Sequence, residues 1–170
     1  MSDSPLPGTL IDRISEATGR ATAWLTLAMV LVSFVIVIIR YVFDSGFIWL
    51  QESLTWMHAV VFMLGAAYTL QRDEHVRVDI FYRDMSVKRR AIVNLCGVLF
   101  FIFPLCVFFI FEGFGYVAAS WEIHEVSRNS GGLPYPFVPL LKSVLLIMPI
   151  AVLLQGASML LRSIVDLRRG

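Results

Sequence analysis

The stretch AIVNLCGVLFFIFPLCVFFIF, residues 91–111, contains no charged side chain and decides the fold. The hydrocarbon core of a bilayer is about 30 Å thick, and a helix rising about 1.5 Å per residue needs about 20 residues to cross it. This stretch therefore predicts a transmembrane helix. It includes Pro104, which lacks an amide hydrogen and favours a kink inside a helix.

Three further uncharged stretches of similar length flank it, at residues 21–39, 53–71 and 143–161, and the last of them contains Pro149. Charged residues make up only 16% of the chain and hydrophobic residues 58%, so little sequence is left for a separate soluble domain. The sequence predicts an all-α membrane protein forming one domain over residues 1–170. The predicted transmembrane helices span about 21–43, 47–71, 91–120 and 137–162.

Basic residues are concentrated before the first stretch, between the second and third stretches, and after the fourth. Because the cytoplasmic loops of membrane proteins are enriched in Lys and Arg, these three places and both termini are predicted to be cytoplasmic. In the other two connections the only basic residues are Arg40 and Arg128, and Lys142 stands at the start of the fourth span. They are predicted to face the outside.

Two segments beside the spans have the composition of amphipathic helices at the membrane surface. In residues 9–20, apolar residues recur on one helical face and charged residues on the opposite face. This segment either lies along the surface or extends the first span, and the sequence favours neither. Residues 76–90 combine apolar side chains with Lys88, Arg89 and Arg90, which are predicted to contact lipid headgroups.

The outer connection between Trp121 and Pro139 contains Gly131-Gly132-Leu133-Pro134, a composition typical of turns. We expect it to fold back towards the membrane. The second span is expected to begin near Phe47. The third is expected to run on to about Ser120 as a long helix.

Four charged residues lie at the predicted outer boundary, namely Arg40, Glu52, Glu112 and Lys142. An unpaired charge in hydrocarbon costs several kcal/mol, so each of these residues is a functional candidate. Arg40 and Glu52 either pair and fix the first hairpin or reach the interface independently. Glu112 either lies at the interface or contacts a partner subunit. A bridge between Glu112 and Lys142 is a further alternative.

The sequence offers few groups for catalysis or metal binding. His58 is the only histidine within a span, whereas a haem in a helix bundle usually needs two axial ligands, so a packing or hydrogen-bonding role is favoured. His75 and His124 are predicted to lie on opposite sides of the membrane. Cys96 and Cys106 lie about 15 Å apart along one predicted helix, too far for a disulfide. We expect no catalytic residue, no metal site and no cofactor in this chain.

Several short motifs occur in an order that resembles that of a known family. They are Arg40-Tyr41-Val42-Phe43, Trp49, Glu52, the Gly65-Ala66-Ala67 turn, His75-Val76-Arg77-Val78-Asp79, Ser127, Gly132-Leu133-Pro134 and Pro149. Across roughly residues 23–155 their order and spacing resemble the small membrane subunit, of the DctQ type, of tripartite ATP-independent periplasmic (TRAP) transporters. Asp73-Glu74 stand where many relatives have a glycine, which affects only the local turn.

In that family a periplasmic binding protein captures an organic acid, and a large membrane subunit moves it together with sodium ions. The resemblance implies that this chain is a scaffold in a bacterial or archaeal inner membrane, with the sodium ions held by the large subunit. Its expected partners are the large subunit, the binding protein and membrane lipids, and not nucleic acid. The candidate assembly residues are Arg40, Trp49, Glu52, Gly65, Glu112, Ser127, Pro134 and Lys142.

Two other functions remain as alternatives. The membrane anchor of a redox complex would need paired histidines or loop cysteines, and the sequence has neither. A stand-alone four-helix exporter would need a carboxylate inside the membrane, along its substrate path. Glu52 and Glu112 are the only candidates for that role, and both lie near one predicted surface.

Overall fold

The computed structural model describes residues 10–72 and 85–169, and within them every regular element is a helix. The elements are α1 (Leu10–Val42), α2 (Ile48–Gln71), α4 (Val87–Gly97), a π-helical turn η1 (Val98–Ile102), α5 (Phe103–Glu122) and α6 (Phe137–Arg169). Four helical segments are long and apolar enough to cross a membrane: Ile11–Val42, Ile48–Gln71, Val87–Glu122 and Phe137–Val165. The predictions of an all-α protein with four spans and of a long third helix are confirmed.

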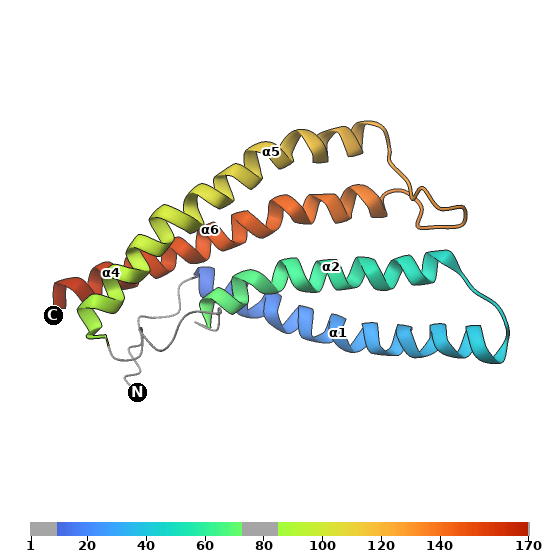
Figure 1. The fold of residues 1–170 in the computed structure, drawn as a ribbon, viewed down its shortest axis with the longest axis horizontal. Coiled ribbons are helices and arrows are strands. Elements are labelled where there is room, and N and C mark those ends of the chain that lie inside the picture. The colour runs from blue at the N-terminus through green and yellow to red at the C-terminus, as the bar shows by residue number, and fades with distance from the viewer. Residues whose placement is uncertain (1–9, 73–84, 170) are drawn as a thin grey trace.

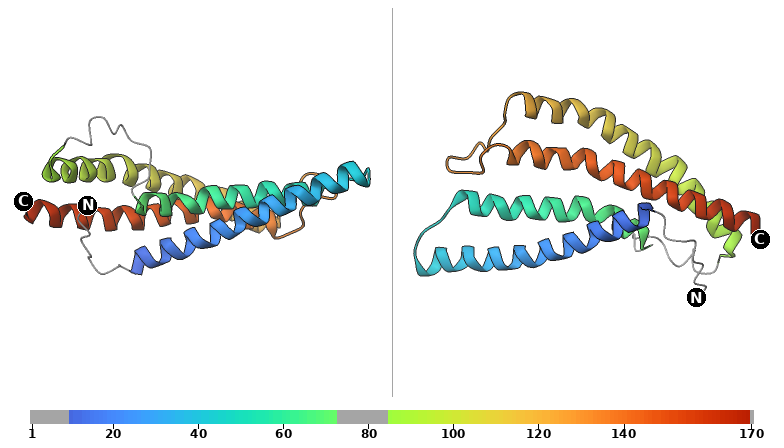
Figure 2. Two further views of the ribbon diagram at one scale, coloured as in Figure 1. Left: turned by 90° about the horizontal axis from the view of Figure 1, so that it is seen from below. Right: turned by 180° about the vertical axis from the view of Figure 1, so that it is seen from behind.

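The helices lie side by side in a row, in the order α1, α2, α6, α5 (Figure 1). α2 packs between α1 and α6, while α6 also packs against α4 and α5. The start of α1 and the end of α6 lie at the same end of the row as the start of α4, and further views agree (Figure 2). We call this the inner end, because the sequence predicts that it is cytoplasmic, and the opposite end the outer end.

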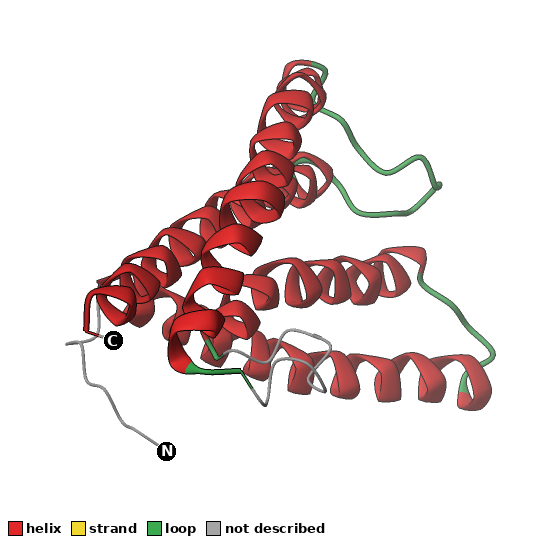
Figure 3. Cartoon of the chain, turned by 60° about the vertical axis from the view of Figure 1, so that its left-hand side comes forward, coloured by secondary structure: helices red, strands yellow, loops and turns green. Residues whose placement is uncertain are grey.

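The two hairpins diverge towards the outer end, where the connection of residues 123–136 reaches from α5 and α6 across to α2 (Figure 3). This connection folds back onto the start of α2, because Trp49 N donates a hydrogen bond to Gly131 O at 3.1 Å. The indole Nε1 of Trp56 on α2 also donates to Phe137 O at 2.9 Å. The outer end is therefore closed by polar contacts and not by a thick apolar core.

Close helix contacts depend on small residues. A Cβ added at Gly19 of α1 would lie 2.5 Å from the Tyr68 ring of α2, and one added at Gly156 of α6 would lie 3.3 Å from Val98. Small residues let helix backbones approach in a bilayer, where lipid tails are as apolar as the side chains. Between 6% and 17% of the most apolar window of each span is buried, so wide apolar faces are left for lipid or a partner.

The two prolines within spans have different surroundings. Pro104 is the second residue of α5, which follows the π-helical turn η1, and Phe103 N donates to Val98 O. A π-helical turn contains one residue more than an α-helical hydrogen-bonded turn, so it shifts the hydrogen-bonding pattern of the helix. Here the shift occurs next to Pro104, which has no N–H to donate. Pro149 is fully buried inside α6.

The first predicted surface segment is part of α1, which runs without a break from Leu10 into the first span. Of the two alternatives for this segment, the structure shows a continuation of the first span and not a separate helix along the membrane surface. Of the second predicted surface helix, residues 76–84 lie outside the described residues. Its last part forms the start of α4, where Ser86 Oγ accepts a hydrogen bond from Arg89 N at 3.4 Å.

The predicted orientation can be tested by cysteine labelling. In a background with Cys96→Ala and Cys106→Ala, we expect Ser130→Cys, which is exposed at the outer end, to react with an impermeant maleimide in intact cells. Lys88→Cys, exposed at the inner end, is the matched control and is expected to react only after the inner face is opened. The reverse pattern of labelling would show that the orientation is wrong.

Candidate functional site

Glu52, near the start of α2, organises a polar cluster at the outer end. Its carboxylate accepts hydrogen bonds from Ser127 Oγ at 2.6 Å, Asn129 Nδ2 at 2.7 Å and Leu133 N at 2.7 Å. The last three residues belong to the connection between α5 and α6. We call Glu52, Ser127, Asn129 and Leu133 the outer clasp, because they join the two hairpins through one side chain.

The backbone around Gly132 fits tightly into the outer clasp. Ser127 N donates to Leu133 O at 3.2 Å and so closes the connection into a loop around Gly132. A Cβ added at Gly132 would lie 2.6 Å from Glu52 Oε2, and closer still to Ser127 Oγ. The structure thus brings together Trp49, Glu52, Ser127 and the Gly132-Leu133-Pro134 motif, which are far apart in the sequence.

Lys142, in the second turn of α6, forms an ion pair with Glu125 in the outer connection. The distance between Lys142 Nζ and Glu125 Oε2 is 2.5 Å, and Ser120 Oγ donates to the same oxygen at 2.6 Å. The two charged side chains are only 16% and 17% exposed. The Lys142 ammonium also lies 4.0 Å from the centroid of the Tyr116 ring, a cation–π contact. This ion pair ties the connection to both α5 and α6.

Neither of the ion pairs considered from the sequence forms within the described residues. The Glu52 carboxylate is occupied by the outer connection and not by Arg40. Lys142 binds Glu125 and not Glu112, because the connection folds back over the start of α6. Arg40 and Glu112 are both exposed. Sequence reasoning missed Glu125, whose partner lies 17 residues further on; the only signal was a Gly/Pro-rich connection that folds back.

The ion pair predicts a dependence of stability on pH. The hydrogen bond from Lys142, with a second one from Ser120, holds the pKa of Glu125 below its usual value. A depressed pKa means that the stabilisation is present above the unfolded-state pKa and is lost as the pH falls through the folded-state pKa. We expect the melting temperature of the purified protein to fall on acidification through this range, and Glu125→Gln to make this fall smaller. Protonation of Glu52, whose carboxylate accepts three hydrogen bonds in the outer clasp, contributes the remainder.

The Glu125→Gln variant should also melt at a lower temperature than the parent at neutral pH, because the positive charge of Lys142 is left without its carboxylate partner. Glu122→Gln is the matched control, since Glu122 is exposed at the end of α5 and its carboxylate forms no ion pair among the residues that the structure describes. An identical acid step in the parent and in Glu125→Gln would contradict the assignment.

A second polar cluster joins α1, α2 and α6 at the inner end. Asp12 accepts hydrogen bonds from Arg162 Nη2 at 2.6 Å and from Gln155 Nε2 at 3.3 Å. Ser15 Oγ donates to Gln155 Oε1 at 3.2 Å, and Gln71 Nε2 donates to Asp12 O at 3.0 Å. We call these five residues the inner clasp. Asp12 is only 7% exposed and Gln155 only 2%, so the amphipathic pattern of residues 9–20 does not show which charged residue is buried.

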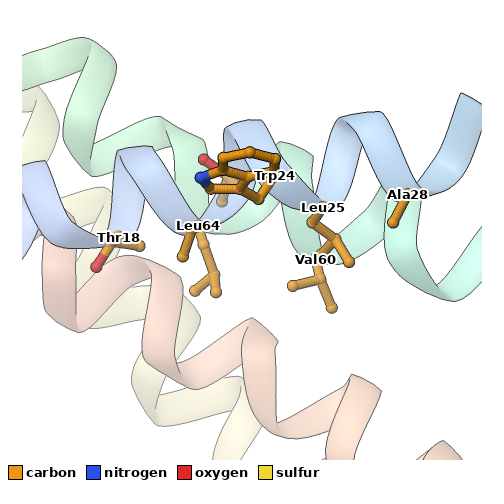
Figure 4. Close-up of a pocket in the computed structure, with 8 residues that line it drawn as sticks. Thr18, Trp24, Leu25, Ala28, Val60 and Leu64 are labelled. Atoms are coloured by element: carbon orange, nitrogen blue, oxygen red, sulfur yellow. The ribbon is translucent and has the colours of Figure 1, made fainter.

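An apolar groove with a volume of about 390 Å³ lies between α1 and α2 (Figure 4). It is lined by Thr18, Ala21, Thr22, Trp24, Leu25, Ala28, Val60 and Leu64, and the labelled side chains follow the two helices along its length. None of these residues carries a charge. The groove is suited to hydrocarbon and not to a polar substrate.

The other sequence candidates lie within α2, at the outer end or at the inner end. Gly65 is inside α2 and not in a turn, and a Cβ added there would meet nothing within 4 Å. Trp49 and Pro134 are exposed at the outer end, and Lys88 and Arg89 are exposed at the inner end. Their roles in assembly or lipid contact stay predictions.

The described residues contain no cluster suited to a metal ion. No three His, Cys, Asp or Glu side chains among them come close enough together. Cys96 and Cys106 are both free thiols, the first exposed and the second buried. Each residue of the two clasps forms at least one hydrogen bond within the chain, although Gln71 Oε1 is buried without a partner among the described residues. What the arrangement can do is hold helices and a loop in place.

The chain matches the model of one transporter family. Residues 29–169 match the family described as tripartite ATP-independent periplasmic transporters, DctQ component. The chain belongs to the DctQ family. The family consists of components of TRAP transporters and not of enzymes, so this DctQ chain is a small permease subunit. Together with its four spans, this makes it a multi-pass protein of the inner membrane.

A DctQ relative supports this assignment. The C4-dicarboxylate TRAP transporter small permease protein DctQ of Vibrio cholerae serotype O1 (strain ATCC 39315 / El Tor Inaba N16961) is 31% identical over 71 residues. The alignment covers 42% of this chain and 31% of that protein, so it spans about a third of the relative's length.

Proposed function

We propose that this chain is the scaffold subunit of a sodium-coupled, binding-protein-dependent TRAP transporter for an organic acid. It holds the large transport subunit in the bilayer, while the large subunit and the binding protein bind the sodium ions and the substrate. C4-dicarboxylates are the first candidate substrates to test, because the relative from Vibrio cholerae is named for them.

The observation that carries this proposal is the separation of polar and apolar surface along the helix row. Charged side chains lie at the two ends, where the inner clasp, the outer clasp and the Lys142–Glu125 pair use them within the chain. The uncharged stretches 21–39, 53–71, 91–111 and 143–161 lie between these ends. A substrate or ion path usually needs charged or titratable groups at membrane depth, and these stretches contain no charged residue and a single histidine, His58.

The edges of the row are suited to contact with another membrane protein. α1 forms one edge and α5 the other (Figure 1). Both helices expose large apolar side chains. Examples are Leu31 and Phe34 on α1 and Phe108 and Phe111 on α5. Since only a small share of each span is buried within the chain, a partner has a broad surface on which to pack.

Copurification and reconstitution test the proposal. We expect the tagged chain to copurify from its native membrane with a larger, many-spanning protein, and to transport no substrate when reconstituted alone in liposomes. Uptake of carboxylates by this chain alone would contradict the scaffold assignment. A coloured protein with a haem spectrum after purification would favour the redox-anchor alternative.

A further inference from the structure

The turn between α1 and α2 contains a polar hollow that none of the outer-clasp residues lines. Its volume is about 430 Å³, and it is lined by Arg40, Asp44, Ser45, Gly46, Ile48 and Gln51. Ser45 N donates to Ile39 O at 3.2 Å, and Ser45 Oγ donates to Phe43 O at 3.0 Å. These bonds fix the backbone that places Arg40 and Asp44 around the same hollow.

Arg40 and Asp44 carry opposite charges and are exposed. Within residues 10–72 and 85–169 neither forms an ion pair or a side-chain hydrogen bond, with the other or with any further residue. Asp44 has a φ of 48°, a left-handed conformation that Asp and Asn tolerate better than most residues. The hollow therefore presents one free cation and one free anion.

The hollow lies at the depth of lipid headgroups. The first span ends at Val42 and the second begins at Ile48, so the turn is at the membrane surface. Aromatic side chains, which are enriched at membrane–water interfaces, surround it. Tyr41 is 80% exposed, and Phe43, Phe47 and Trp49 are also exposed. Below the turn, Phe34 and Val37 expose an apolar face of α1 on which acyl chains can lie.

We propose that this hollow binds the headgroup of a zwitterionic phospholipid, with the lipid phosphate on Arg40 and the lipid ammonium on Asp44. A guanidinium binds phosphate through two parallel hydrogen bonds, and an ammonium donates to a carboxylate. Gln51 and Ser45 supply further polar groups beside the phosphate. An anionic lipid such as phosphatidylglycerol fits less well, because it has no cation for Asp44.

Lipid retention measured by native mass spectrometry tests this site in the full chain, purified with its associated membrane partner. Phosphatidylethanolamine, phosphatidylglycerol and phosphatidylcholine are added in separate arms. We expect phosphatidylethanolamine to be retained about tenfold better than phosphatidylglycerol, the size of effect expected from one charge-assisted hydrogen bond. Phosphatidylcholine should be retained less well than phosphatidylethanolamine, because its ammonium has no N–H to donate.

Variants separate the two charges. Arg40→Gln is expected to lower retention of phosphatidylethanolamine about tenfold. Asp44→Asn keeps the left-handed backbone accessible and is expected to abolish the preference for phosphatidylethanolamine over phosphatidylglycerol. Arg128→Gln is the matched control, since Arg128 is exposed in the other outer connection and does not line the hollow. It should leave lipid retention unchanged.

Several outcomes would overturn the proposal. Equal retention of the two lipids by the parent protein would do so, as would an unchanged lipid preference in Asp44→Asn. Competition by soluble glycerophosphoethanolamine at concentrations equal to those of the lipid would show a site for free zwitterions. Loss of the membrane partner in Arg40→Gln with lipid retention unchanged would show that the hollow is a protein contact.

Discussion

Replacing Asp12 with alanine is expected to lower the free energy of unfolding by about 3 kcal/mol. Removing one member of a buried ion pair typically costs about 3 to 5 kcal/mol, because the partner charge is left uncompensated. The lower limit applies here, since the Arg162 side chain is 43% exposed and can turn towards water. Gln155, which is 2% exposed, also loses an acceptor for its amide group.

Unfolding of the purified protein in mixed micelles, with denaturing detergent added stepwise, measures this effect. Glu16→Ala is the matched control one turn further along α1. Its carboxylate lies 4.0 Å from Arg72, and both side chains are about half exposed, so the change should cost no more than about 1 kcal/mol. Equal losses in the two variants would mean that the inner clasp does not hold α1 against α6.

Replacing Gly132 with alanine is expected to destabilise the outer end by about 1 to 3 kcal/mol, the usual cost of overpacking a filled site. The new methyl group would lie 2.6 Å from Glu52 Oε2, so the carboxylate or the loop must move. Either movement breaks hydrogen bonds of the outer clasp. The same unfolding assay, together with proteolysis of the outer connection, measures the result.

Gly46→Ala is the control for this change, because it is also at the outer end and an added Cβ would meet nothing within 4 Å. Its effect should stay within about 0.5 kcal/mol, as for most surface substitutions. Glu52→Gln should make the outer connection more sensitive to protease, since an amide cannot accept hydrogen bonds at both of its terminal atoms. A stable Gly132→Ala protein with protease resistance equal to that of the parent would contradict the described geometry.

The spans could be predicted from the sequence because each depends on a local property. An uncharged run of about 20 residues has few alternatives to a transmembrane helix. The long third helix could also be predicted from its apolar sequence. The connection that folds back could be predicted from its glycines and prolines. The start of α2 at Ile48 was also close to the expected residue.

The clasps could not be predicted, because they join residues that are far apart in the chain. Asp12 and Arg162 are separated by 150 positions, and Glu52 and Ser127 by 75. Local pattern favoured Arg40 as the partner of Glu52, because both lie at the ends of one hairpin. The folded connection instead brings three donors to the carboxylate and leaves Arg40 exposed.

The resemblance to a family added what local pattern lacked. It marked Trp49, Glu52, Ser127 and Gly132-Leu133-Pro134 together, and the structure places them in one cluster at the outer end. It did not mark Glu125 or Asp12, which hold the connection and the inner end. Motif order thus indicated one clasp and gave no information on the other.

We propose that this chain supports transport by a partner subunit and does not itself provide the substrate path. Sodium-driven substrate uptake into proteoliposomes tests it most directly, with the large subunit and the binding protein present and this chain either included or left out. Uptake is expected only when all three proteins are present. Full sodium-driven uptake by the large subunit and the binding protein without this chain would contradict the claim.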